Sequence, residues 1–226
     1  SGWVDTGSRG DANVTRVLGA RAGLGAQIGE QWRLDVTGFL QLLESRDSQY
    51  VYEPRQRSRP GQLAEPHDND LRHASARLAR QVGSTHIVVS SGYTSHEVVD
   101  EQDATIGAGS FGLPDPQLLD IERQYRVWDN EVRINGTFGR LTWLAGVSHI
   151  SASQDELWTL SSDTDSLVID EDRRTTRESA LFGDVTLPLG SAFRINGGAR
   201  LFRSKVRETR VIAGERQTRH HSKTGL

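Results

Sequence analysis

The sequence predicts an all-β fold, an antiparallel up-and-down transmembrane β-barrel fragment with about four hairpins. Three observations favour it: apolar and polar residues alternate along extended segments, short turns join these segments in pairs, and long polar stretches separate the pairs. In the clearest segment, residues 32–42, even positions are apolar except for a glycine, and most odd positions are polar. Such alternation places one set of side chains on each face of a strand.

Four hairpins follow from this alternation. Each joins two segments through a short turn that contains glycine: residues 18–28 with 32–42, 70–82 with 85–96, 124–138 with 140–151, and 177–187 with 193–205. The turn glycines recur at intervals of 54, 56 and 51 residues, and they are Gly29, Gly83, Gly139 and Gly190. The sequences around them are unrelated, so the architecture repeats without a duplicated module.

Long polar stretches connect the hairpins. Residues 46–69, 99–123 and 153–176 are rich in charged residues, Ser and Pro and show no sustained period, which predicts three long loops. Outer-membrane barrels have short turns on the periplasmic side and long loops on the extracellular side. The sequence therefore predicts this orientation for the four hairpins.

The two faces of the predicted strands differ in polarity. Three aromatic residues, Trp32, Phe138 and Phe193, lie on the apolar face beside a short turn, where a barrel carries an interfacial girdle and a β-sandwich caps its core. Charged residues of both signs point away from the apolar face: Arg21, Asp35, Arg77, Glu131, Arg133, Asp184, Arg194 and Arg200. They would line a barrel lumen or form the solvated surface of a sandwich, and alternation alone does not separate the two. Arg80 interrupts the apolar face near a turn, where its charged end can reach water.

Composition excludes several classes of protein. The 226 residues carry a net charge of −3, without the basic excess of a nucleic-acid-binding protein. The longest apolar runs are too short for a membrane-spanning helix, and the absence of Cys excludes disulfides and thiolate metal sites. Residues 1–5 lack the features of a signal peptide, so we expect a cytosolic protein or a fragment. No nucleophile elbow or catalytic dyad is evident, so we expect no enzyme and no cofactor.

Three motifs favour ordinary loops over ligand sites. Residues 107–112 fit G-x-G-x-x-G, but Pro114 and Pro116 follow at once and prevent the helix that a dinucleotide site needs. Acidic clusters at 100–103, 163–165 and 170–172 are expected to be solvated loop charge, with cations that bridge lipopolysaccharide as a minor alternative. The pair His220 and His221 has no third ligand nearby, and we expect a loop there and no metal site.

The first predicted long loop holds the candidate ligand-binding residues. Aromatic rings and guanidinium groups suit an anionic, catechol-bearing ferric complex, and the candidates are Tyr50, Tyr52, Arg55, Arg57 and Arg59. The alternative is a solvated basic loop without a ligand.

Several stretches also resemble the middle of TonB-dependent receptor barrels, in that family's order and over nearly the whole chain. They are residues 2–5 (GWVD), 11–13 (DAN), 19–39, 47–50 (DSQY), 65–68 (EPHD), 130–133 (NEVR), 141–147 (LTWLAGV), 180–186 (ALFGDVT) and 196–200 (NGGAR). Members of the family are similar in having a plug domain with a TonB box inside a 22-stranded barrel, and most import ferric siderophores.

The resemblance implies a location and a set of partners. The location would be the cell outer membrane of a Gram-negative bacterium, and the function TonB-dependent uptake of a scarce nutrient, most commonly a ferric siderophore or other iron complex. The partners would be outer-membrane lipid and lipopolysaccharide, the TonB complex acting through a plug, and a ferric siderophore or similar small ligand, without nucleic acid. Two alternatives stay open: a non-transporting structural barrel or adhesin, and a soluble all-β binding protein.

The number of turns bears on how much of a barrel the chain would form. Four short turns against three long loops predict both termini at the loop side, whereas a complete barrel has one more long loop than short turns. We therefore expect residues 1–226 to form a partial receptor barrel domain without the plug.

Overall fold

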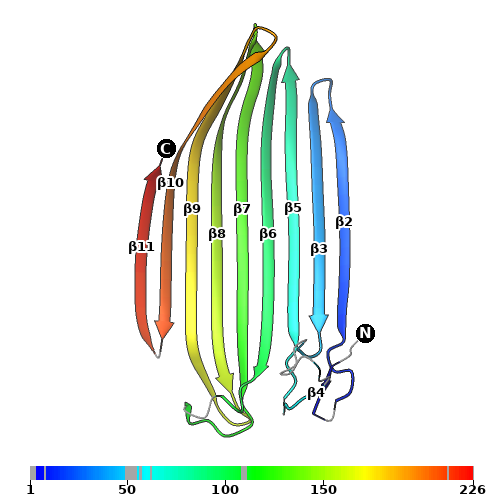
Figure 1. Cartoon of the computed structure of the whole chain (residues 1–226), viewed down its shortest axis with the longest axis vertical. Helices are drawn as coiled ribbons and strands as arrows, with labels where there is room; N and C mark the ends of the chain where they lie inside the picture. The colour runs from blue at the N-terminus through cyan, green and yellow to red at the C-terminus, as the bar shows by residue number, and fades with distance from the viewer. Residues whose placement is uncertain are drawn as a thin grey trace.

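The computed structural model describes residues 4–7, 9–48, 55, 58–61, 63–107, 111–212 and 214–225. Within these ranges the chain forms one antiparallel sheet of nine strands in the order β11-β10-β9-β8-β7-β6-β5-β3-β2 (Figure 1). A two-residue parallel pair, β1 (Asp5–Thr6) with β4 (Ser58–Arg59), lies beside one end of the sheet. No helix of the described residues is long and apolar enough to cross a membrane.

The nine strands follow an up-and-down path, since each pairs with its neighbour in sequence. They are β2 (Thr15–Ile28), β3 (Trp32–Ser45), β5 (His67–Val82), β6 (Thr85–Asp103), β7 (Leu118–Phe138), β8 (Leu141–Ser161), β9 (Ser166–Leu189), β10 (Phe193–Ile212) and β11 (Glu215–Gly225). The four predicted hairpins are confirmed, with φ of 58° to 76° at the turn glycines Gly29, Gly83, Gly139 and Gly190. Only glycine adopts such angles without a steric cost, which fixes the turns and with them the register.

The predicted long loops are wrong in their extent. Strand β6 continues to Asp103 and β7 begins at Leu118, while β8 and β9 are separated only by residues 162–165. The alternation of hydrophobicity stops within these strands because their loop-side ends mix polar and apolar residues on both faces. The hydrogen-bonded ladder nevertheless continues, with a register shift only at Trp158 and Thr159.

Strand β11 is a further departure from prediction. It pairs with β10 from Phe202↔Gly225 to Ile212↔Glu215 and contains no apolar residue, so no periodic signal marks it. Because β11 runs back from the loop end, the two described ends of the chain do not lie at the same end of the sheet (Figure 1). The predicted placement of both termini at the loop end is therefore wrong.

The register confirms the predicted division into two faces. Trp32, Phe138 and Phe193 share one face, which we call the apolar face, and all eight predicted charged residues lie on the other, the polar face. Most exposed large apolar side chains of the sheet lie on the apolar face, and Phe138 is 81% exposed. The buried apolar side chains of the sheet all lie on the polar face: Ala79, Val88, Val98, Ile121, Leu160 and Ala180. Side chains converge on the concave side of a curved sheet, so the polar face is the inner one.

The apolar face carries a band of limited height. On β7 the band runs from Phe138, at the short turn, to Trp128, ten residues earlier, where Tyr93 of β6 is the paired residue. Ten residues of strand measure about 33 Å, and at a tilt of about 40° the band is about 25 Å tall. This matches the apolar band of an outer-membrane barrel, which has aromatic residues at both edges. We call these residues and their neighbours on the apolar face the apolar band.

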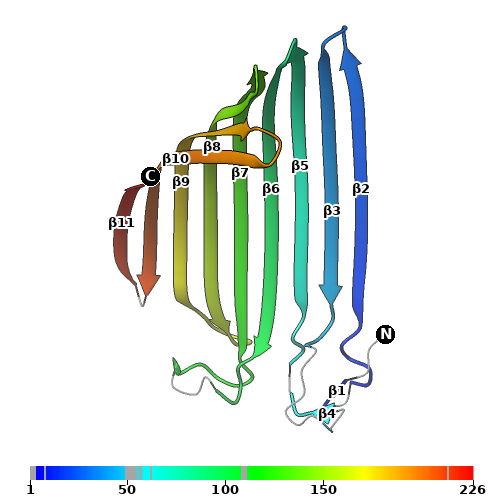
Figure 2. The same cartoon turned by 45° about the horizontal axis from the view of Figure 1, so that its top comes forward.

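The described strands form a single layer, whereas a sandwich needs a second sheet facing the first. Figure 2 shows the β9–β10 hairpin bending out of the general strand direction at its short-turn end, as a sheet that curls toward closure does. The sandwich alternative is not supported by this arrangement.

Candidate functional site

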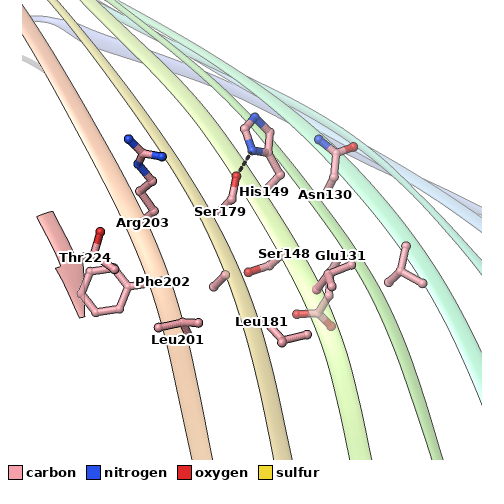
Figure 3. A pocket seen from close by; sticks show the side chains of 13 residues that line it. Asn130, Glu131, Ser148, His149, Ser179, Leu181, Leu201, Phe202, Arg203 and Thr224 are labelled. Atoms are coloured by element: carbon pink, nitrogen blue, oxygen red, sulfur yellow. Dashed lines mark hydrogen bonds between the residues drawn. The ribbon is translucent and has the colours of Figure 1, made fainter. Parts of the chain in front are cut away.

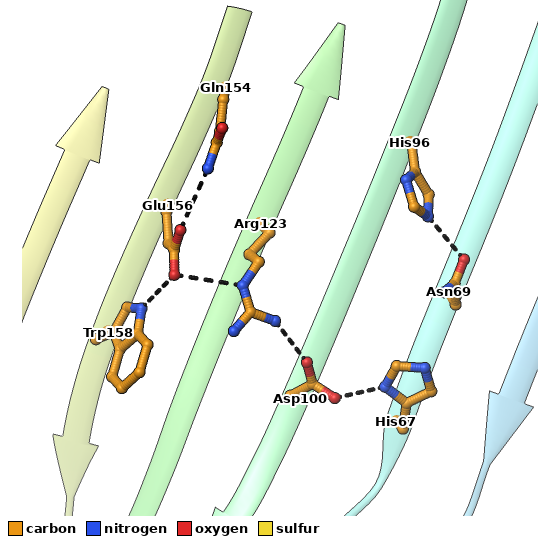
Figure 4. A network of polar contacts seen from close by, with 8 residues as sticks. All are labelled: His67, Asn69, His96, Asp100, Arg123, Gln154, Glu156 and Trp158. Carbon is orange, nitrogen blue, oxygen red and sulfur yellow. Dashed lines mark hydrogen bonds and ion pairs between the residues drawn. The ribbon is translucent and has the colours of Figure 1, made fainter. Parts of the chain in front are cut away.

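On the polar face, near the loop end, a charged network crosses four adjacent strands (Figure 4). Arg123 of β7 lies between two carboxylates: its Nη1 is 2.8 Å from Asp100 Oδ2 and its Nε is 3.3 Å from Glu156 Oε1. Asp100 also contacts His67 Nδ1 at 2.5 Å, and Trp158 Nε1 donates to Glu156 Oε1 at 2.6 Å. Each carboxylate thus has at least two partners, which holds the side chains of β5 to β8 in fixed positions.

The hairpin register explains why these residues meet. His67 pairs directly with Asp100 across β5 and β6, and Arg123 pairs directly with Glu156 across β7 and β8. Asp100 and Arg123 are diagonal neighbours, because the residue opposite Arg123 is Val98. Long side chains span such diagonals, so two hairpins are joined by one guanidinium group.

Aromatic rings lie beside the network on the same face. The rings of His96 and Tyr125 stack with centroids 5.7 Å apart, and His96 Nε2 is 2.8 Å from Asn69 Oδ1. On the adjacent strands Phe39 and His73 stack with centroids 5.3 Å apart. This wall offers flat aromatic surfaces together with hydrogen-bonding groups, the combination that binds small polar ligands.

The charged surface continues across β9 and β10. Arg210 Nε lies 3.0 Å from both carboxylate oxygens of Asp170, a bidentate contact. Burial raises the pKa of the neighbouring Asp172 carboxyl, and the charge of Glu208 raises it further, while Arg210 opposes the shift. These residues lie on the loop side of the apolar band, where charges face water.

A cluster of buried polar groups orders the loop end below β2, β3 and β5. Asp47 is 1% exposed; its Oδ2 lies 3.1 Å from Arg9 Nη2, and its Oδ1 accepts from the backbone N–H of Glu65 at 3.2 Å. Glu65 Oε1 accepts from the backbone N–H of Asp103, whose Oδ2 accepts from that of Leu63. The N-terminal segment, the first loop and the end of β6 are therefore held together at the rim of the polar face.

The five predicted ligand residues are placed only in part. Tyr50, Tyr52 and Arg57 lie outside the described residues. Arg55 is exposed in a turn, and Arg59 lies in β4, where its backbone pairs with Thr6. Their assignment to a ligand stays a prediction.

Two other motifs take defined positions. His220 and His221 lie in β11 and not in a loop as predicted, and because successive residues of a strand point to opposite faces they cannot share a metal ion. Among the described residues no group of three or more His, Asp or Glu side chains is arranged to hold a metal ion. In the G-x-G-x-x-G motif, Gly107 lies in a turn after β6. From Phe111 the chain continues into β7 without a long helix.

Neither a comparison with family models nor one with curated proteins finds a match to the sequence. Solved structures match over most of the chain. The ferric yersiniabactin uptake receptor FyuA from Yersinia pestis superimposes with a TM-score of 0.74 at 11% identity, covering 99% of this chain and 36% of FyuA. The fold is that of a TonB-dependent receptor barrel.

Two further structures support the same fold. The ferric citrate transporter FecA in its unliganded form gives a TM-score of 0.67 at 13% identity, over 94% of this chain and 33% of FecA. BauA, the ferric preacinetobactin receptor from Acinetobacter baumannii, gives 0.59 at 12% identity, over 93% and 36%. All three are receptors or transporters and not enzymes. This chain spans about a third of the length of each.

The central residues of the network were missed in the sequence, because they lie in segments predicted to be loops. The sequence does contain a signal for them, which is the register of each hairpin counted outward from its turn. Gly83 and Ser84 centre the β5–β6 hairpin, and continuing its register outward places Asp100 opposite His67. The same extension from the turn at Gly139 places Glu156 opposite Arg123. Extending the ladder beyond the last apolar residue would have predicted both pairs.

Proposed function

We propose that this chain forms part of the barrel wall of an outer-membrane receptor that takes up a scarce small nutrient, a ferric siderophore or other iron complex. One observation carries the proposal: a single curved sheet has an apolar band about 25 Å tall on its outer face and a charge-paired, aromatic-containing inner face. A lipid bilayer on one side and a polar ligand path on the other account for both faces.

The substrate class rests on the similar structures and on the chemistry of the wall. FyuA, FecA and BauA are named for ferric complexes. The stacked pair of His96 and Tyr125 offers aromatic surface and hydrogen-bonding groups to a ligand of that kind. The loop residues Tyr50 and Arg55 would add contacts of the same chemistry from the extracellular side. In this proposal residues 1–226 are a partial barrel domain, and TonB acts through a plug elsewhere in the protein.

Deletion of the full-length gene, followed by growth on a scarce iron source and uptake of radioactive iron as ferric siderophore, tests the proposal. We expect the deletion strain to lose uptake and the protein to fractionate with the outer membrane. Equal growth and uptake with and without the gene would favour the structural barrel or adhesin. Recovery of the protein as a compact monomer without detergent would favour a soluble binding protein.

A matched pair of variants tests the role of the inner face. Tyr125→Leu removes an aromatic ring from the polar face, and Tyr93→Leu removes one from the apolar face at the edge of the band. Because only the first faces the ligand path, we expect Tyr125→Leu to lower uptake while Tyr93→Leu leaves it near the wild-type level. Equal uptake by both variants, at equal amounts in the outer membrane, would argue against this ligand path.

A further inference from the structure

A groove lies on the outer face of the sheet at the loop-side edge of the apolar band (Figure 3). It spans β7 to β11, is open to one side, and has a volume of about 550 Å³. Its lining changes character along the strands, from aliphatic side chains toward the short turns to polar side chains toward the loops; those that define it are Val132, Val147, Leu181, Leu201, His149 and Arg203. His149 Nδ1 lies 2.9 Å from Ser179 Oγ, which fixes the imidazole at the polar end.

The polar end of the groove leads into a cluster of cations on the same face. By register Arg203 pairs with Ser179, Lys205 with Arg177, and Arg207 with Thr175, so these three cations of β10 point outward. A second hollow of about 450 Å³, lined by Arg177, Lys205 and Arg207 among others, continues the groove away from the band. We call Arg177, Arg203, Lys205 and Arg207 the outer cation cluster.

In their contacts, these four cations differ from most other cations of the sheet. Within the described part of the chain, no carboxylate lies within 4 Å of any member of the outer cation cluster. Elsewhere on the outer face, Arg72 contacts Asp70 and Arg126 contacts Asp155. Four neighbouring positive charges without counter-charges repel one another, so an anion at this position lowers the electrostatic energy of the fold.

We propose that the groove and the outer cation cluster bind one phosphorylated lipid of the outer leaflet, with an acyl chain along the aliphatic floor and headgroup phosphate at the cations. Guanidinium groups bind phosphate oxygens through paired hydrogen bonds. On β10 the run of apolar residues on the outer face ends at Leu201, and the cluster straddles the register row of the band-edge residue Trp128, at the depth of lipid headgroups. The inference rests on the proposed membrane location, and it adds a lipid site that the transport proposal does not require.

The test is a titration of the full-length protein, purified in detergent and stripped of lipid, with bisphosphorylated lipid A, followed by native mass spectrometry. The variant carries Arg203→Gln, Lys205→Gln and Arg207→Gln. Each cation near an anionic lipid surface contributes about fivefold in affinity, so we expect binding to weaken by roughly 100-fold. Lys205→Gln alone should weaken it about fivefold, which keeps the test valid if the triple variant is unstable.

The matched control removes three cations from the polar face of β10 and β11, with Arg194→Gln, Arg200→Gln and Arg219→Gln. We expect this control to bind lipid A as the wild type does. The proposal is overturned if the outer triple variant binds as tightly as the wild type, or if the control loses binding equally. It is also overturned if inorganic phosphate displaces the lipid fully, or if an acyl-free bisphosphorylated disaccharide binds as tightly.

Fractionation separates this inference from the proposed function. We expect the outer triple variant to reach the outer membrane and to take up iron, with only its lipid binding reduced. A wild-type protein that is absent from the outer membrane would instead contradict the membrane location itself. A membrane-located wild type that binds no lipid A would contradict the lipid site alone.

Discussion

The guanidinium of Arg80 lies over the indole ring of Trp32, with Arg80 Cζ 5.1 Å from the ring centroid. The two residues are paired on adjacent strands of the apolar face, and Arg80 Nη2 also donates to Gln31 Oε1 at 2.6 Å in the short turn. The charge that interrupts the apolar face is therefore placed at its edge, where the ring and the turn stabilise it.

An arginine at the middle of the apolar band should destabilise the fold far more than Arg80 does at its edge. We expect Val132→Arg, on the apolar face between the two aromatic edges, to lower the free energy of unfolding by about 2–4 kcal/mol in lipid vesicles. Urea unfolding of the full-length protein in vesicles measures this. Asn135→Arg, on the polar face of the same strand, is the control and should change stability by less than about 1 kcal/mol. Equal costs for both would contradict the assignment of faces.

Arg123 should contribute more to stability than Arg126, three residues later on the same strand. Arg123→Gln leaves the carboxylates of Asp100 and Glu156 without their shared cation, and because these groups are about one-quarter exposed we expect a loss of about 1–2 kcal/mol. Arg126 is 43% exposed and faces outward, so Arg126→Gln should cost less than about 1 kcal/mol. Unfolding midpoints in denaturant compare the two variants. A larger effect at Arg126 would show that the network does not hold the inner wall.

Two carboxyls at the loop end give the fold a defined pH dependence. Glu101 and Asp120 are paired residues on the outer face, each eight positions along its strand from the band residue Tyr93 or Trp128, and thus outside the apolar band. Burial raises the pKa of Glu101, and Asp120 and Asp68 raise it further. Burial and then Glu122 raise the pKa of Asp120.

The sign of the effect follows from these directions. A carboxyl whose pKa is higher in the folded state than in the unfolded chain favours folding while protonated, and this stability is lost as pH rises through its folded pKa. We therefore expect Glu101→Gln and Asp120→Asn to raise stability at pH 7 and to flatten its pH dependence above pH 4.5 and 3.8, the respective ordinary values. Thermal unfolding from pH 4 to pH 8 tests this, with Glu97→Gln as the control. Unchanged pH profiles in both variants would contradict it.

The sequence predicts the part of the fold that lies inside the apolar band. There, one face contacts an apolar phase and the other a polar one, so alternation identifies the strands, their turns and the face of each charged residue. Asp35 and Arg77 are an example: both are predicted to lie on the polar face, and Arg77 Nη1 lies 3.4 Å from Asp35 Oδ2. Beyond the band both faces meet water, and the signal disappears although the ladder continues. Strand β11, which has no apolar residue, is the extreme case. The network around Arg123 lies in this region and depends on contacts between residues more than 20 positions apart.

Close packing on the inner face gives a last test of the fold. A Cβ atom added at Gly146 of β8 would lie 2.4 Å from Phe182 Cζ and 3.0 Å from the carbonyl oxygen of Val132. Because a ring and a backbone must both shift, we expect Gly146→Ala to lower the free energy of unfolding by about 1–3 kcal/mol. At Gly197, on the outer face of β10, the same Cβ meets nothing within 4 Å. Gly197→Ala should be neutral or stabilise by about 0.5 kcal/mol, since alanine restricts the unfolded chain. Denaturant unfolding of both variants decides the matter, and a neutral Gly146→Ala would mean that Phe182 does not pack against β8 on the inner face.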